Sequence, residues 1–464
     1  MTPRSTTPPA DAIETGTELR RQLPRGTHGE WTPAGDRADP VAILLEQDEF
    51  RSADLVPIRH GRMGASSSAF YRGAAAIMAA DLAATPTTGL TVQLCGDAHL
   101  SNFGVFASPE RQLLFDLNDF DETLPGPWEW DLKRLVTSFT IAARSNGLRG
   151  RESEDAAALA CAARYRSAMA EFARMTPLDT WYARTNADEV VASARQYVGK
   201  EQRRRAEANL AKARQRTSLN AARKLCTEVD GRLRIVDDPP LVMPLSTVVS
   251  TRQVNKLRAG IKDTYHQYRE SLLPGPRGVL EGYEFVDIAH KIVGVGSVGL
   301  RAFIGLLQCR RTGAPLLLQM KEARASVLEK FLQPSEHEQP GHRVVEGQRQ
   351  MQAASDIFLG WSASTLDGRH YYWRQLRDMK ASADIDHMGP VALAAYARVC
   401  GWSLARAHAR SGQPTAIAGY LGNSDRFDRA MAEFAHRYAD QNEADFAAHQ
   451  LAVADGRVKA ATGL

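Results

Sequence analysis

A glycine cluster followed by a lysine-ended strand sets the first restriction on how this sequence can fold. The cluster GVGSVG (residues 294–299) comes after the apolar segment HKIV, and a later run, PLLLQMKEA, alternates in polarity and contains Lys321. Alternation with a period of two is typical of a β-strand. Glycines let backbone N–H groups approach phosphates, and a lysine can neutralise phosphate charge. The pattern therefore predicts a nucleotide-binding sheet, with cofactor contacts from Gly294, Gly296, Ser297, Gly299 and Lys321.

The same glycines also fit a second architecture. GVGSVG satisfies the spacing G-x-G-x-x-G, apolar residues at helical spacing follow it, and Glu322 lies at the end of the next apolar run. Strand, glycine turn, helix, strand and acid together are typical of a dinucleotide-binding unit, which would indicate an NAD(P)-binding oxidoreductase. The two interpretations differ at residues 300–310, which form a strand in the first and a helix in the second. We favour the strand, because Gly305 weakens a helix.

A polar loop with nearby carboxylates carries the chemistry of the first interpretation. The loop GDAHLSNFG places Asp97 five residues before Asn102, and the acidic stretch NDFDE follows soon after. Phosphoryl transfer requires a carboxylate near the attacking hydroxyl, and an amide oxygen and a second carboxylate that hold Mg²⁺ against the phosphates. We expect Asp97 to orient or deprotonate the acceptor, and Asn102 to bind Mg²⁺. Asp116 is the first candidate for the second metal ligand, and Asp119 and Asp121 are its alternatives.

The lysine that ends the strand needs a carboxylate to position it, because an ammonium group in a cleft loses much of its hydration. Glu346, on a helix predicted after the strand, is the first candidate for this contact. Glu322 and Glu329 are the alternatives.

A third interpretation starts from the same loop. Asp97 and His99 form the D-x-H of a metallophosphoesterase, in which a carboxylate and an imidazole bind two metal ions. Such a site needs further histidines, and the downstream GNSD (residues 422–425) has none at its third position. We therefore expect His99 to brace the loop rather than to bind metal.

Composition excludes several classes of function. Lys and Arg number 58 against 54 Asp and Glu, so the net charge of +4 does not call for a nucleic-acid partner. The 5 cysteines lack C-x-x-C spacing, which argues against a disulfide framework and favours a reducing, cytoplasmic setting. No apolar stretch approaches the length of a membrane span, so we expect no membrane partner.

The loop and the helix after it resemble those of a known enzyme group. GDAHLSN is similar to the G-D-x-H-x-x-N catalytic loop of aminoglycoside phosphotransferases and other protein-kinase-like enzymes. PWEWDLKRL looks like the start of the helix whose aspartate braces that loop, a role that would fall to Asp131. More closely, GDAHLSNFG, FDLNDFDET, KIVGVGSVG, LQMKEA, RVVEGQRQMQAASDIFLGW, RQLRDMK and LARAHARSG together resemble a bacterial family, domain of unknown function 2252, from about residue 50 to residue 450.

The order of the motifs differs from that of kinase-like enzymes. There the glycine loop, lysine strand, glutamate helix, linker strand and long helix precede the catalytic loop and the metal aspartate. Here Asp97 and Asp116 come first, and Gly294, Lys321 and Glu346 follow, which is the same cycle cut at another place. Circular permutation is tolerated where termini lie close together. The resemblance therefore implies an α+β, protein-kinase-like two-lobe fold, circularly permuted, with a large and mainly helical C-lobe.

We expect the chain to be divided accordingly. Residues 1–40, rich in proline and poor in apolar side chains, are predicted to be a flexible tail. The Ala- and Arg-rich region before the glycine cluster reads as mostly helical, and we expect it to carry acceptor specificity. The predicted parts are the catalytic-loop part of the large lobe (41–150), its helical part (151–285), the small nucleotide-binding lobe (286–380) and helices that return to the large lobe (381–464).

The resemblance implies an ATP-dependent, Mg²⁺-dependent phosphotransferase acting on a hydroxyl-bearing acceptor. A non-catalytic nucleotide-binding module, a nucleotidyl transferase that holds ATP inverted, and the NAD(P)-binding oxidoreductase remain the alternatives. The same lysine and metal ligands would serve a small-molecule or a protein acceptor, and the sequence marks neither.

Overall fold

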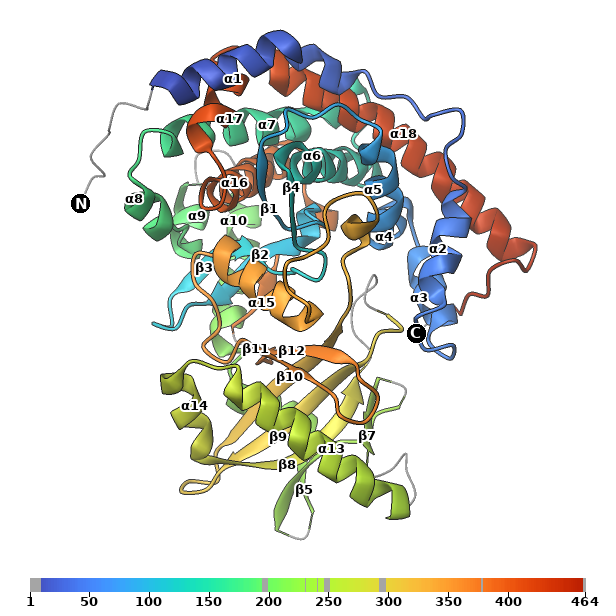
Figure 1. Ribbon diagram of the computed structural model, residues 1–464, viewed down its shortest axis with the longest axis vertical. Coiled ribbons are helices and arrows are strands. Elements are labelled where there is room, and N and C mark those ends of the chain that lie inside the picture. The colour runs from blue at the N-terminus through green and yellow to red at the C-terminus, as the bar shows by residue number, and fades with distance from the viewer. Residues whose placement is uncertain are drawn as a thin grey trace.

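The computed structural model describes residues 10–193, 199–229, 231–239, 241–245, 251–291, 298–376 and 379–461. Figure 1 shows a larger helical body above a smaller body built on a sheet. The helical body is formed by residues 10–215 and 379–461, and the sheet body by residues 218–375, with α15 (Pro340–Met351) lying between the two.

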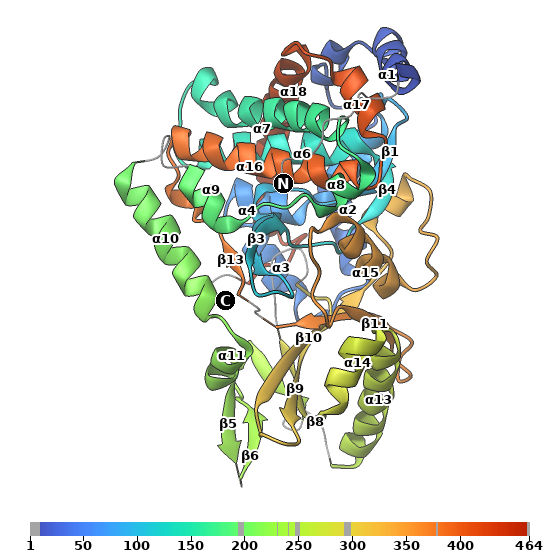
Figure 2. The ribbon, with the colours of Figure 1, turned by 90° about the vertical axis from the view of Figure 1, so that its left-hand side faces the viewer.

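The sheet body contains an antiparallel sheet of six strands in the order β11-β12-β10-β9-β8-β7. Side chains alternate between its faces, as the sequence of β10 predicted. Leu316 and Leu318 pack under α13 and α14, whereas Leu317 packs with α11 on the opposite face. Tyr268 of α13 stacks on Trp373 of β12 with ring centroids 4.6 Å apart. Figure 2 shows α13 and α14 on one side of the sheet and α11 with the β5-β6 hairpin on the other. The strands are β7 (Val242–Pro244), β8 (Tyr283–Lys291), β9 (Ala302–Cys309), β10 (Pro315–Ala323), β11 (Gly360–Ala363) and β12 (His370–Gln375), and the flanking elements are α11 (Ser218–Leu225), β5 (Cys226–Val229), β6 (Arg232–Ile235), α13 (Thr251–Glu270) and α14 (Pro274–Glu281).

The residues after the glycine cluster decide between the two architectures considered above. They form β9, which pairs with both β8 and β10, and no helix occurs between residues 300 and 310. A dinucleotide-binding unit needs a helix at this point, so the oxidoreductase interpretation of GVGSVG is wrong. Gly305 is accommodated in the strand, where an added Cβ would lie 3.0 Å from the ring of Phe285.

The sheet body begins earlier in the chain than predicted. Residues 218–285 were expected to belong to the helical lobe, but α11, α13 and α14 pack on the sheet. Part of the predicted helical region is also extended, because Cys226–Val229 and Arg232–Ile235 pair as the strands β5 and β6. The small body therefore starts near residue 218 rather than at 286.

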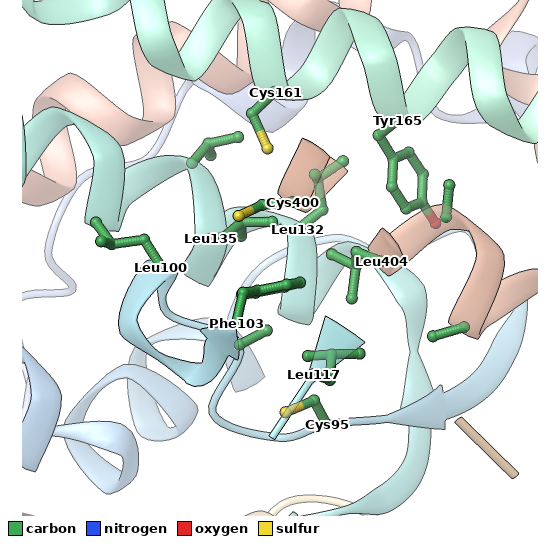
Figure 3. Packing of buried hydrophobic residues seen from close by; sticks show 14 of the residues in the cluster. Cys95, Leu100, Phe103, Leu117, Leu132, Leu135, Cys161, Tyr165, Cys400 and Leu404 are labelled. Carbon is green, nitrogen blue, oxygen red and sulfur yellow. The ribbon is translucent and has the colours of Figure 1, made fainter. Parts of the chain in front are cut away.

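The helical body is organised around α6, α7, α16 and α18. α7 and α16 approach closely, since an added Cβ on Gly401 would lie 2.4 Å from the carbonyl oxygen of Cys161. Figure 3 shows the core between these helices and the polar loop, where Cys161, Cys400 and Leu404 meet Leu132 and Leu135 of α6. The helices are α6 (Trp128–Ser145), α7 (Arg151–Phe172), α16 (Pro390–Ala409) and α18 (Arg426–Ala454).

Short elements complete the helical body and surround the polar loop. β1 pairs with β4, and β2 pairs with β3 in a hairpin that follows the polar loop. β13, which follows the last strand of the sheet body in the chain, adds to this hairpin by pairing with β2. The helix expected to begin at PWEWDLKRL and the helix expected to carry Glu346 are confirmed as α6 and α15. The remaining elements are α2 (Pro40–Asp48), α3 (Val56–Met63), α4 (Ser67–Gly73), α5 (Ala75–Ala83), β1 (Thr91–Leu94), η2 (Leu100–Asn102), β2 (Phe103–Ala107), β3 (Leu113–Leu117), β4 (Leu124–Pro127), α8 (Pro177–Tyr182), α9 (Ala187–Ser193), α10 (Lys200–Gln215), η4 (Val327–Lys330), β13 (Ala381–Ser382), η5 (Ile385–His387) and α17 (Pro414–Leu421).

The N-terminal region is not a flexible tail over residues 10–40. It forms α1 (Ala10–Gln22) and η1 (Arg25–Gly29), which pack on α17 and α18. His28 is buried and its Nε2 lies 2.7 Å from the Tyr420 hydroxyl oxygen, and the ring of Trp31 packs on Tyr438. Tertiary contacts with α17 and α18 thus order an N-terminal segment whose own apolar content is too low to order it alone.

None of the described helices combines the length and the apolar composition that crossing a membrane requires.

The contact of α1 with α17 predicts that Gly16→Ala destabilises the protein. An added Cβ at Gly16 would lie 2.0 Å from the carbonyl oxygen of Ala416, a backbone atom of α17 that cannot move without shifting the helix. We expect a loss of about 1–3 kcal/mol in the free energy of unfolding, measured by urea denaturation. Gly278→Ala is the matched control, because that helical glycine has no neighbour within 4 Å and should gain about 0.5–1 kcal/mol. Equal effects of the two changes would contradict the packing argument.

Candidate active site

The polar loop is fixed at its start by Asp131 in the first turn of α6. The carboxylate of Asp131 accepts hydrogen bonds from the backbone N–H groups of Cys95 (2.6 Å) and Gly96 (3.0 Å). Its Oδ2 also lies 3.3 Å from Nε2 of His408, whose Nδ1 lies 2.8 Å from the Tyr165 hydroxyl oxygen. The predicted bracing role of Asp131 is confirmed.

Gly96 allows the loop to lie directly against the acidic stretch. Its φ is +82°, and an added Cβ would lie 2.2 Å from the carbonyl oxygen of Glu122. The Glu122 carboxylate accepts the N–H of Val327, and its carbonyl oxygen accepts the hydroxyl of Ser326. The loop, the acidic stretch and the segment after β10 are thus tied together.

Asp97 lies partly exposed in this loop, and one of its oxygens is held by an arginine. Nε of Arg134 donates to Oδ1 at 2.5 Å, whereas Oδ2 accepts no hydrogen bond from the described residues and lies 3.8 Å from Nε2 of His99. Burial raises the pKa of Asp97, and the charges of Arg134 and Arg72 oppose that rise. Oδ2 is therefore available to a ligand, and its proton affinity is tuned by two arginines.

Asn102 and His99 shape the rest of the loop. The Asn102 side-chain amide donates to the carbonyl oxygen of Asp97 at 2.7 Å, which leaves its own oxygen for other contacts. Nδ1 of the buried His99 accepts the N–H of Ser101. This contact fits the loop-bracing role expected of His99.

Lys321 of the sheet body contacts the acidic stretch of the helical body. Its Nζ lies 2.7 Å from Oδ2 of Asp121 and 3.7 Å from Oδ1 of Asp119. Tyr372 is the partner of Lys321 across the β10-β12 ladder, and its hydroxyl donates to Oδ1 of Asp121 at 2.7 Å. A cluster of Lys321, Asp119, Asp121 and Tyr372 therefore joins the two bodies.

The charges in this cluster stabilise one another unequally. Burial disfavours the charged form of Lys321, but Asp119 and Asp121 outweigh it and raise the lysine pKa. Burial likewise opposes ionisation of Asp121, yet Lys321 keeps its pKa below the usual value. Burial and the charge of Asp121 raise the pKa of Asp119. Asp119 is therefore the less satisfied of the two carboxylates.

Asp116, the first candidate for the second metal ligand, has another role. Both of its oxygens lie 2.7 Å from a guanidinium nitrogen of Arg406, and Oδ2 also accepts the N–H of Ala353. Both side chains of the ion pair are 1% exposed. A carboxylate neutralised by a buried arginine is a poor metal ligand, so Asp119, the alternative, becomes the stronger candidate for that role.

Glu346, expected to contact Lys321, does not do so. Its carboxylate lies 2.8 Å from Arg349 and 3.9 Å from His342 on its own helix. The alternatives Glu322 and Glu329 are also engaged elsewhere, Glu322 with Arg369 and Glu329 at the cap of η4. Carboxylates from the acidic stretch, nearly two hundred residues earlier, take the place that we had given to a helix beside the strand.

Part of the glycine cluster lies outside the described residues. Gly294, Gly296 and Ser297 belong to that part, whereas Gly299 is described and has a φ of +94°. The described ends of the segment continue into β8 and β9, next to Lys321 of β10.

A divalent cation at this site would need ligands besides protein carboxylates. Among the described residues, no three His, Cys, Asp or Glu side chains converge to hold a metal ion by themselves. Oδ1 of Asp119 is buried, accepts no hydrogen bond from the described residues and lies 3.7 Å from Nζ of Lys321. Mg²⁺ is commonly bound by one or two carboxylates together with substrate phosphates. Asp119 is therefore the candidate carboxylate for such a cation, and Asn102, whose backbone carbonyl oxygen accepts the N–H of Asn118, is the candidate amide.

The sequence did not point to Arg134, Tyr372 or Arg72 as members of the site. Arg134 follows Asp131 by three residues and so lies on the same face of α6, which was the available signal. Tyr372 could be found only from the strand register, and Arg72 only from the three-dimensional position of α4.

Comparison with known proteins gives a family. A family model described as an uncharacterized protein conserved in bacteria (DUF2252) matches residues 51–452. No curated protein and no solved structure matches the chain. The match extends over most of the sequence and confirms the family resemblance inferred from the motifs.

The buried ion pair predicts that Arg406→Met destabilises the protein strongly. Removal of one partner leaves the Asp116 carboxylate buried without a counter-charge, which costs about 3–5 kcal/mol. The free energy of unfolding in urea measures this loss. The double variant Arg406→Met/Asp116→Leu should recover a large part of it, because no buried charge remains. If the double variant is no more stable than the single one, the ion pair is not the source of the effect.

Proposed function

We propose that this chain, which belongs to the bacterial family DUF2252 and whose acidic stretch contacts a lysine-ended strand, is an ATP- and Mg²⁺-dependent phosphotransferase that acts on a hydroxyl-bearing acceptor. The observation that carries the proposal is the contact of Lys321 with Asp121 and Asp119, which places a candidate phosphate-binding cation at the candidate metal site.

The arrangement of the sheet body supports this proposal. Chain order from β8 runs through the glycine segment, β9, the lysine strand β10, the helix α15 and the strands β11 and β12. β13 then pairs with β2, directly after the polar loop, and the long helix α16 follows. This is the sequence of parts that the resemblance to kinase-like enzymes leads us to expect after circular permutation. We propose on this basis a permuted kinase-like fold.

The proposed reaction assigns a role to each side chain of the site. Lys321 neutralises the phosphate chain of ATP, and Asp119 with Asn102 holds Mg²⁺, which neutralises charge on the transferred group. Asp97 orients the acceptor hydroxyl through Oδ2 and accepts its proton. The acceptor oxygen bonds to the γ-phosphorus while the bond from that phosphorus to the β-γ bridging oxygen breaks, and ADP leaves. Arg134 keeps the Asp97 carboxylate in place throughout.

Labelled ATP tests the proposed reaction. With water as the acceptor, the protein should release label from γ-labelled ATP in a Mg²⁺-dependent manner and leave α-labelled nucleotide as ADP. Asp97→Asn should lower this turnover by about 10²–10⁴-fold, the usual contribution of a general base. Affinity for Mg-ATP should remain close to that of the parent protein.

Asp425→Asn, an exposed carboxylate far from the loop, is the control and should be fully active. Full activity of Asp97→Asn would remove Asp97 from the mechanism. Transfer of α-label instead of γ-label would show nucleotidyl transfer and would overturn the assignment of the reaction.

The pKa of Asp97 gives the reaction a pH dependence that Arg72 should control. Asp97 must be ionised to accept a proton, so activity is lost as pH falls through its raised pKa. Arg72 lowers that pKa, and Arg72→Gln should therefore move the acid limb of the kcat/KM profile to higher pH. Arg21→Gln, a surface control paired with Glu18, should leave the profile unchanged. An acid limb that stays in place or moves to lower pH in Arg72→Gln would contradict the assignment.

A further inference from the structure

The segment between α2 and α3 contacts the described end of the glycine segment. The N–H of Ser52 donates to the carbonyl oxygen of Gly299 at 2.9 Å, and the guanidinium of Arg51 donates to the carbonyl oxygen of Val298 at 2.5 Å. Val298 is 1% exposed and packs on Ile58 of α3. Part of the helical body therefore holds the sheet body at the glycine segment, as well as at Lys321.

Gly299 is shaped for this contact. Its φ of +94° is favourable only for glycine, and an added Cβ would lie 2.8 Å from Cβ of Arg51. The close approach brings the aliphatic part of the Arg51 side chain against Gly299.

The guanidinium of the half-buried Arg51 is poorly compensated. Among the described residues it has no ion pair with a carboxylate, and its Nε is buried without a hydrogen-bond partner. Burial, and then the charge of Arg59, lower its pKa to about 9. The nearest acids are occupied, because Asp48 pairs with Arg59 and with His60. The hydrogen bond to the carbonyl oxygen of Val298 uses only one of the five N–H donors of a guanidinium.

Arg51 also lies within electrostatic range of the acidic stretch. Its charge interacts with that of Glu122, and Glu122 in turn interacts with Asp121 and Asp97. A cation that contacts the described end of the glycine segment and interacts with the acidic stretch, with donors left over, is suited to bind phosphate oxygens.

We propose that Arg51 is a phosphate-binding residue, contributed to the nucleotide site by the α2-α3 connection, which also holds Val298 and Gly299. This inference rests on the proposed function, since it takes the phosphate chain to be that of ATP. It adds to Lys321 a second cation, one that comes from the helical body and not from the sheet.

Titration of the full-length protein with Mg-ATP, AMP and Mg-tripolyphosphate tests the inference. Arg51→Ala should weaken binding of Mg-ATP and of tripolyphosphate by about 10- to 100-fold, the range for a hydrogen bond to a charged group. Binding of AMP, which lacks the β- and γ-phosphates, should change much less. Arg51→Lys keeps the charge and should recover part of the loss.

Ile58→Ala is the matched control, because it loosens the packing on Val298 and leaves the arginine in place. It should affect Mg-ATP and AMP to a similar and small extent. If Arg51→Ala weakens AMP as much as Mg-ATP, or behaves like Ile58→Ala, Arg51 only supports the loop and the inference is wrong. Unchanged Mg-ATP and tripolyphosphate binding in Arg51→Ala would also overturn it.

Failure of the proposed function has a different signature. The parent protein would then release no label from γ-labelled ATP, whether or not it binds Mg-ATP. Loss of tripolyphosphate binding in Arg51→Ala would still support the role of Arg51 in phosphate binding, and a parent protein that binds neither ligand would overturn both proposals.

Discussion

The contact of the Lys321 ammonium with the carboxylates of Asp121 and Asp119 joins the sheet body to the helical body at the candidate site. An almost fully buried lysine retains its charge only if opposite charges replace its lost hydration. The strand register contributes to this stabilisation, because Tyr372 lies opposite Lys321 on the same face and donates to Asp121. The opposite charges themselves come from the helical body. The relative position of sheet and acidic stretch therefore follows from the need to pair buried charge.

Other buried polar contacts, from α6 and α16, hold the polar loop and its flanking strand. Asp131 accepts two backbone N–H groups of the loop, and Arg134 on the same helix holds Asp97. Arg406 of α16 neutralises Asp116 in the strand that precedes the acidic stretch. Each contact links the loop or its flanking strands to a helix whose opposite side is packed in the apolar core (Figure 3). The core thus makes the loop rigid, and the buried charges set its orientation.

The ends of the chain contribute to the site indirectly. α1 and η1 pack on α17 and α18, and Asp48 at the end of α2 lies against His60, which contacts His449 of α18. These contacts secure the connection that carries Arg51. Contacts within the helical body therefore help to position Val298 and Gly299 of the sheet body, although these parts lie far apart in the sequence.

The sequence by itself determined the local elements and the kinds of residue in the site. Period-two alternation predicted β10 with Lys321 near its end, GDAHLSN and the acids after it predicted the polar loop, and PWEWDLKRL predicted the start of α6 with its bracing Asp131. These are short-range patterns, in which neighbouring residues decide the outcome. Only the tertiary structure decided that Asp121 pairs with Lys321 and that Asp116 pairs with Arg406. It also decided that residues 10–40 are ordered. Such pairings join residues hundreds of positions apart, and they follow from the burial of charge and apolar surface in the assembled fold, which no local pattern records.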